Sequence, residues 1–117
     1  MAFEMNIYPE RKVMRVAVIG MYKAEDGPEF AAAYAKHVAQ INPSESTLVL
    51  DASELIATKM DLVPDLSAAF KAYMSTGFKE YITVQPKSAV CRMQLTRAAS
   101  NVNFPSNFVD SWSPEGV

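Results

Sequence analysis

The side chains best suited to acid–base or nucleophilic chemistry are the single histidine, His37, and the single cysteine, Cys91. A catalytic pair of this kind needs its two groups within hydrogen-bond reach, and the spacing of these residues does not imply that closeness. His37 falls on a helical stripe of apolar residues, between Tyr34 and Ile41, a position typical of a half-buried histidine bonded to a neighbour. Cys91 also lies in a helical apolar pattern and is expected to be a small buried side chain. We therefore assign no catalytic residue and expect that the protein is not an enzyme.

Metal and cofactor chemistry lack the residue patterns that they require. A single cysteine can form neither an internal disulfide nor a cysteine-based zinc cluster. The four glycines are scattered at positions 20, 27, 77 and 116, so they do not build a phosphate-binding loop. Carboxylate pairs such as Glu25 with Asp26 suit helix starts, where negative charge interacts favourably with the helix dipole. The sequence therefore predicts no cofactor and no metal site.

One polar segment follows a predicted strand, at the edge where α/β proteins usually carry their function. Residues 48–50 (LVL) indicate a buried strand, and we expect residues 51–62 to form a loop at its carboxyl end. Hydroxyls and opposite charges in this loop can make directional contacts to another protein. The expected partner-binding residues are Ser53, Glu54, Thr58, Lys59, Met60 and Asp61. The alternative is that Ser53 and Asp61 only cap backbone groups while Lys59 is solvated.

Length and composition limit the class of protein. The chain has 117 residues, of which 50% are hydrophobic and 21% charged, values typical of one ordinary globular domain. A formal net charge of −2 and the lack of a Lys or Arg cluster argue against nucleic-acid binding. No apolar run approaches the roughly 20 residues that cross a bilayer, and the first residues lack a signal-peptide pattern. We therefore expect a cytoplasmic protein without membrane insertion.

Strand and helix patterns alternate along the chain. Strands are predicted over residues 3–8, 13–22, 47–50 and 81–84, and residues 107–112 form either a last edge strand or an irregular segment. Helices are predicted from Asp26 to about Ile41, from Asp61 or Pro64 to a left-handed terminator at Gly77, and over residues 88–102. Residues 113–117 are expected to be a flexible tail.

This order predicts a single α/β domain, with a mixed sheet of four to five strands and about three helices packed on it. With about three helices available, one face of the sheet is expected to stay partly uncovered. Two-fold association can bury an uncovered face or an edge strand, and we therefore expect a homodimer.

Several short segments resemble the STAS family, named for sulfate transporters and anti-sigma factor antagonists. They are residues 20–22 (GMY), 25–26 (ED), 28–30 (PEF), 48–53 (LVLDAS) and 83–90 (TVQPKSAV), within a likeness over roughly residues 13–112. The resemblance implies a STAS-like domain with a regulatory role exerted through another protein.

The predicted loop departs from that family at its regulatory switch. Phosphorylatable members carry an aspartate–serine pair, then a small residue and a glycine, at the start of the second helix, and a partner kinase phosphorylates the serine. Lys59 and Met60 stand near those two positions, and no glycine follows before Pro64. Thr58 supplies a hydroxyl only if the alignment is shifted. The resemblance therefore implies a divergent member that lacks the phosphorylatable serine.

Two hypotheses about function follow. The first is a non-catalytic interaction or regulatory module that binds a protein partner, such as a regulatory or sensor protein, through the loop and the second helix. The second is a small apolar-ligand, lipid-like binding domain, which predicts a cavity of about 300 Å³ or more between sheet and helices. Trp112 and Phe108, near the carboxyl end, either anchor an interface or pack against their own domain.

Overall fold

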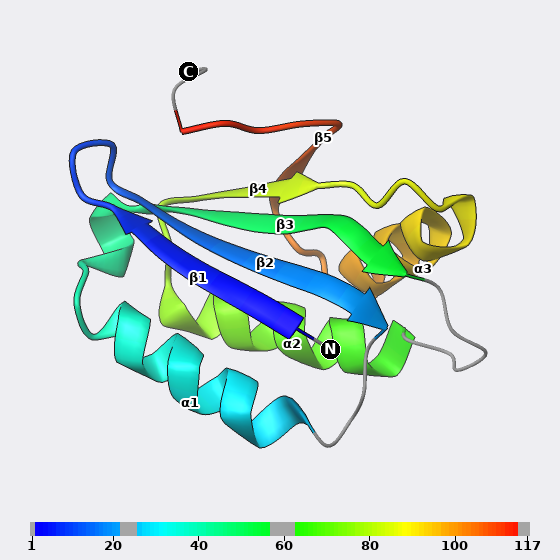
Figure 1. The fold of residues 1–117 in the computed structure, drawn as a ribbon, viewed down its shortest axis with the longest axis horizontal. Helices are drawn as coiled ribbons and strands as arrows, with labels where there is room; N and C mark the ends of the chain where they lie inside the picture. The colour runs from blue at the N-terminus through cyan, green and yellow to red at the C-terminus, as the bar shows by residue number, and fades with distance from the viewer. Residues whose placement is uncertain (1, 22–25, 57–62, 115–117) are drawn as a thin grey trace.

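Five strands form one mixed sheet, and their order in the sheet is their order in the sequence (Figure 1). The protein is represented by a computed structural model that describes residues 2–21, 26–56 and 63–114. The strands are β1 (Ala2–Tyr8), β2 (Val13–Met21), β3 (Thr47–Ile56), β4 (Glu80–Val84) and β5 (Ser106–Val109). Strand β1 runs antiparallel to β2, whereas β2 to β5 are parallel to one another. The predicted α/β domain with a mixed sheet is confirmed.

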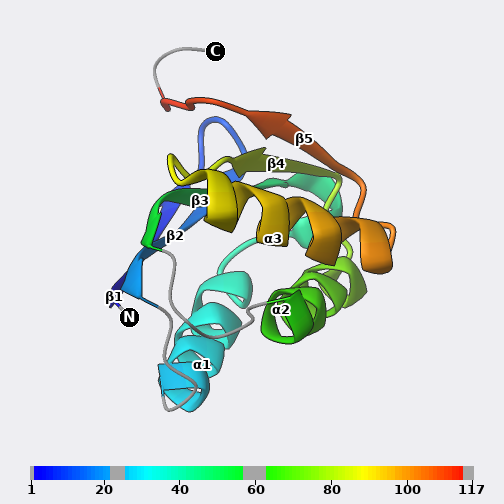
Figure 2. The ribbon, with the colours of Figure 1, turned by 90° about the vertical axis from the view of Figure 1, so that its right-hand side faces the viewer.

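All α-helices of the described chain lie on the same face of the sheet (Figures 1 and 2). They are α1 (Gly27–Val38), α2 (Val63–Thr76) and α3 (Ala89–Asn101), and a short 3-10 helix (Pro43–Glu45) precedes β3. Because the parallel strands follow one another in sequence order, three right-handed crossovers in a row must place their helices on one side. We call the opposite side the helix-free face, and its presence confirms the expectation of a partly uncovered sheet.

Local signals set most helix ends. The Ser88 side chain accepts a hydrogen bond from the Cys91 amide at 3.3 Å and caps α3. Gly77 follows α2 with φ +81°, the left-handed conformation predicted for its terminator. Helix α1 ends at Val38 instead of near Ile41, because the amides of Gln40 and Ile41 bond to carbonyls three residues earlier, in tight turns.

The main core lies between the sheet and the helices. Alternate residues of the central strands are buried there, and apolar side chains of α2 and α3 complete the packing. Cys91 is 1% exposed, so the prediction of a small buried side chain is confirmed. The buried members include Met14, Val16, Leu48, Leu50, Phe70, Tyr73, Tyr81, Leu95, Ala98 and Phe104.

A second, smaller apolar cluster lies on the helix-free face of the sheet and includes Trp112, near the carboxyl end of the described chain. After β5 the chain returns toward the β1–β2 hairpin (Figure 1), where the Trp112 ring lies 5.8 Å from that of Tyr8. Trp112 therefore packs against its own domain, while Phe108 packs against the main core. The cluster comprises Val13, Val49 and Val84 with Tyr8, Ile82, Val109 and Trp112.

Candidate interaction surface

Strand β3 does not end near Leu50 as predicted but continues to Ile56. Its last residues pair with β2 as far as the Met21–Ile56 pair, whereas β4 accompanies β3 only up to Asp51. The ends of β2 and β3 therefore extend beyond β4, as the arrowheads in Figure 1 show. The prediction that Ser53 and Glu54 lie in a loop was wrong, because both belong to this strand.

A β-bulge explains why the strand pattern was not recognised. Ala17 pairs with Asp51 and Ile19 pairs with Glu54, so β3 has one residue more than β2 between these two pairs. Ala52 and Leu55 are both buried although they are three residues apart. This spacing breaks the period of two that identifies a strand in a sequence.

The protruding ends of the two strands expose large apolar side chains. Met21 is 52% exposed and Ile56 is 54% exposed, and the two are directly paired across the strands. Glu54 is also exposed, and Ser53 is half-buried. We call these four residues, Met21, Ser53, Glu54 and Ile56, the β2–β3 tip. Apolar side chains exposed beside charged and polar groups are typical of a protein-contact surface.

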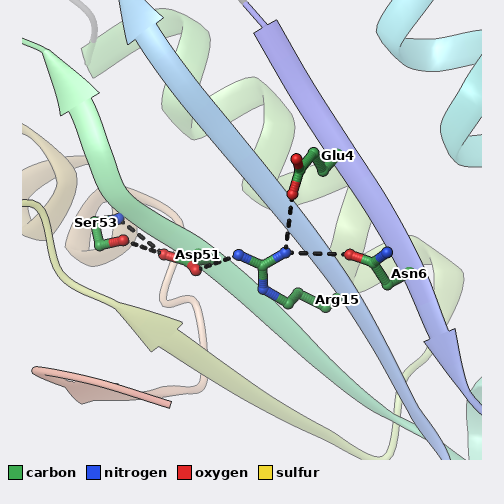
Figure 3. A network of polar contacts seen from close by, with 5 residues as sticks. All are labelled: Glu4, Asn6, Arg15, Asp51 and Ser53. Carbon is green, nitrogen blue, oxygen red and sulfur yellow. Dashed lines mark hydrogen bonds and ion pairs between the residues drawn. The ribbon is translucent and has the colours of Figure 1, made fainter. Parts of the chain in front are cut away.

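A polar network on the helix-free face leads to the tip (Figure 3). The Arg15 guanidinium donates to the Asp51 carboxylate at 2.7 Å and to the Asn6 side-chain oxygen at 3.1 Å, and it lies 3.5 Å from the Glu4 carboxylate. Asp51 also accepts from the amide and the hydroxyl of Ser53, at 3.0 Å and 2.6 Å. The network joins β1, β2 and β3 and holds Ser53 in place at the start of the tip.

The network stabilises the charged forms of its central ion pair. Burial by itself raises the pKa of Asp51, but the hydrogen bonds from Ser53 and the guanidinium of Arg15 outweigh it and hold that pKa below its ordinary value. Burial likewise opposes the charge of Arg15, and its contact with Asp51 outweighs this, so the pKa of Arg15 is raised. The pair is ionised at neutral pH and is not poised for proton transfer.

The other sequence-predicted site residues have different outcomes. Thr58, Lys59, Met60 and Asp61 lie outside the described residues, so their assignment stays a prediction. Ser53 does not cap a helix but bonds to Asp51. Met21 and Ile56 were missed as site residues. For Met21 the signal was length, because the apolar run over residues 13–22 is longer than that over residues 81–84, and strands of unequal length must overhang. For Ile56 there was no such signal, because residues 51–54 (DASE) interrupt the apolar pattern of β3.

The residues considered for chemistry have structural partners. His37 is half-buried, and its Nδ1 donates to the Ala33 carbonyl of its own helix at 2.7 Å, as its position on the apolar stripe predicted. Over residues 2–21, 26–56 and 63–114, no group of three or more His, Cys, Asp or Glu residues could hold a metal ion. None of the helices in these ranges has the length and apolar character to cross a bilayer.

An apolar cavity lies on the other side of the sheet, under α1 and α2. Its volume is about 160 Å³, smaller than the roughly 300 Å³ expected of a site for a lipid-like ligand. Side chains from the sheet and from all three helices line it, among them Val18, Phe30, Leu66, Phe70 and Leu95. Burial raises the pKa of Tyr73, which also lines the cavity, so this phenol is neutral.

Comparisons with protein-family models and with curated proteins found no match to this chain.

Proposed function

We propose that the chain is a non-catalytic protein-interaction module of STAS-like type, which docks a regulatory partner protein through the β2–β3 tip. The observation that carries the proposal is that Met21 and Ile56 are exposed side by side where β2 and β3 extend beyond the end of β4. Leaving such side chains in water is unfavourable, and a partner that covers them gains roughly 25 cal/mol per Å² of apolar area. The tip is the expected strand-end location of partners in an α/β sheet.

Side chains, more than backbone groups, would carry recognition at the tip. The Ser53 amide already donates to Asp51, and a bulge of this kind disturbs the ladder that another strand would extend. The fitting partner therefore presents an apolar centre to Met21 and Ile56 and a basic group to the exposed carboxylate of Glu54.

The regulatory part of the proposal rests on the STAS resemblance. The element order implied by that resemblance agrees with the order of strands and helices in the structure. Lys59 and Met60 stand where the family has its aspartate–serine pair, so the module would act without phosphorylation. We place it in the cytoplasm, where a lone buried cysteine such as Cys91 needs no disulfide partner.

Replacing Ile56 with glutamate tests the docking surface. Partner recovered from a lysate of the source cell by immobilised wild-type chain is identified, purified and titrated against each variant. We expect Ile56→Glu to weaken binding at least tenfold, because it removes a buried aliphatic contact worth about 1.5–3 kcal/mol and introduces a charge. Met93→Glu is the matched control, since Met93 on α3 is 55% exposed and lies outside the tip.

Equal loss of affinity in Ile56→Glu and Met93→Glu, or no loss in either, would contradict docking at the tip. Circular dichroism of both variants checks that the fold is retained. A Lys59→Glu, Met60→Ala double variant tests the neighbouring predicted residues separately, with weaker binding expected if they belong to the same surface.

The module is further proposed to form a homodimer through β1. This strand is an edge of the sheet, spans seven residues and contains neither lysine nor proline, and its one charged residue, Glu4, lies beside Arg15 of the same sheet. The opposite edge, β5, has only four residues. Antiparallel pairing of two β1 strands about a two-fold axis would join the two sheets.

Light scattering at micromolar concentration should return twice the 12.9 kDa mass of the chain. Hydrogen exchange of the β1 amides should become faster on dilution, while amides of the central β3 stay protected. A mass near 12.9 kDa, or β1 exchange that is independent of concentration, would rule out this dimer.

A further inference from the structure

We infer that the cavity beneath α1 is a binding site for a compact apolar molecule about the size of one aromatic ring, neutral or carrying a single amine. The site lies on the face of the sheet that bears the helices and does not depend on a protein partner. It is therefore independent of the function proposed for the β2–β3 tip.

The cavity is walled by apolar groups from several elements. Val16 and Val18 of β2 and Leu50 and Leu55 of β3 form its floor on the sheet. Phe30 of α1, Leu66, Ala69 and Phe70 of α2 and Leu95 of α3 line it from the helix side. An interior of this composition does not bind ordered water well, because water needs two to four polar partners. An apolar ligand is its natural occupant.

Helix α1 forms one wall of this space through Gly27 and Phe30. None of the residues of α1 is fully buried, whereas α2 and α3 each contain several buried residues. The contacts of α1 include two aromatic pairs, Phe30 with Phe3 and Tyr34 with Tyr73, each with ring centroids 5.3 Å apart. The Tyr34 hydroxyl is also hydrogen-bonded to that of Thr76 at 2.8 Å. Gly27, at the first turn of α1, lines the cavity, and a Cβ there would meet nothing within 4 Å.

The volume sets the size of the ligand. The cavity is partly open to solvent, and its interior of about 160 Å³ is much larger than the space that one water molecule needs. A cavity of roughly 150 Å³ lined by aliphatic and aromatic side chains is large enough for benzene. A fatty acid or a sterol exceeds this space, which separates the inference from the lipid-like hypothesis.

The charges at the cavity set the class of the ligand. Its charged lining residues are Asp51 and Asp65, with no Lys, Arg or His among the described residues that line it. The Asp51 carboxylate is bonded to Arg15 and Ser53 on the helix-free face (Figure 3), so that, among the described lining residues, Asp65 is the charged group available to a ligand. A carboxylate disfavours an anion and favours a cation, so neutral molecules and amines fit and acids do not.

Three probes with one ring and one further carbon test both size and charge: toluene, benzylamine and benzoate. We expect toluene and benzylamine to raise the Tm of the full chain, by ~3 °C at three times Kd, with Kd on the order of 1 mM. Benzoate should leave the Tm unchanged. Ala69→Leu, which places a larger side chain in the cavity, should abolish the shift, whereas Ala68→Leu, exposed on the same helix, should preserve it.

A wild-type Tm that responds to neither toluene nor benzylamine would overturn the inference. So would an equal response in Ala69→Leu and Ala68→Leu, or a response to benzoate as large as that to benzylamine. If Ala69→Leu does not fold, methyl NMR of the wild type decides the matter. Toluene must then shift the methyl signals of Val18, Leu50 and Leu66, and shifts confined to other methyls would refute the site.

Discussion

Replacing Phe104 with alanine is expected to lower the free energy of unfolding by about 3–5 kcal/mol, the usual cost of deleting a buried aromatic ring. Phe104 is only 6% exposed. Its ring stacks on Phe70 of α2 with centroids 4.4 Å apart and contacts Tyr81 of β4 at 4.9 Å. One side chain between α3 and β5 therefore joins a helix to the centre of the sheet.

The backbone around Phe104 explains why its ring points inward. Asn103 adopts a left-handed conformation, with φ 55°, just after the cap of α3. The Phe104 amide bonds to the Ala99 carbonyl at 2.9 Å and the Asn103 amide to the Ser100 carbonyl at 3.3 Å, which is the hydrogen-bond pattern of a Schellman motif. The residue after the left-handed position in this motif commonly packs back on its helix, as Phe104 does.

Asn103→Gly is the control for this substitution. Glycine suits the left-handed conformation, so this variant should keep the motif and change stability by no more than about 1 kcal/mol. Urea titrations followed by circular dichroism measure both variants. A cost below about 1 kcal/mol for Phe104→Ala, or an equal cost for both, would show that the ring does not have this role.

The secondary structure was predictable where one local pattern dominates. Apolar runs identified β2 and β4, and helical stripes identified α1, α2 and α3, because these patterns reflect burial on one face or on both. Single residues marked some ends, such as Ser88 before α3 and Gly77 after α2. The uncovered sheet face was expected from the small number of helices available to cover the sheet, and the handedness of crossovers explains it once the strand order is known.

Features that depend on contacts distant in sequence were not predictable. The extension of β3 to Ile56 requires pairing with β2, and the bulge disturbs its alternation. Phe104 lies in the connection between α3 and β5. Neither the helical nor the strand periodicity of apolar residues applies there, so the sequence did not identify it as a core residue. The register of the sheet also lies beyond any local pattern, although it determines which strand ends protrude.

The place of the candidate interaction surface in the sheet was predicted only in outline. The sequence placed it after the apolar run of β3, and Ser53 and Glu54 do lie at that end of the sheet. Their strand conformation was missed, and so were Met21 and Ile56, since their exposure depends on β4 stopping at Val84. From sequence alone, an apolar residue in a strand is predicted to be buried. Its exposure becomes evident only when the length of the neighbouring strand is known.

The two faces of the sheet carry different features. The helix side contains the main core and the cavity, whereas the helix-free face carries the Arg15–Asp51 ion pair. Such a pair adds little net stability over apolar residues of the same size, but removing one partner is costly. Its presence is consistent with a role in fixing the strand ends, and that role is open to measurement.

Asp51→Ala should lower the free energy of unfolding by about 2 kcal/mol at neutral pH. A fully buried pair costs about 3–5 kcal/mol to break, but here the side chains of Arg15 and Asp51 keep 20% and 16% of their exposure. Arg15 also retains Asn6 and Glu4 as partners. Glu4→Gln is the matched control on the same guanidinium, and because Glu4 is largely exposed its loss should cost less than about 1 kcal/mol.

The pH dependence of this difference identifies the charge of Asp51 as its cause. Because the pKa of Asp51 is lower in the folded protein than its ordinary value of 3.8, the unfolded chain takes up the proton first, and acid favours unfolding. The stability gap between wild type and Asp51→Ala should therefore be constant above that value and shrink as the pH falls below it. Urea titrations at neutral pH and at about pH 3 measure the gap. A gap that does not shrink in acid would mean that the lost stability comes from packing, and that the Arg15–Asp51 ion pair does not hold the end of β3.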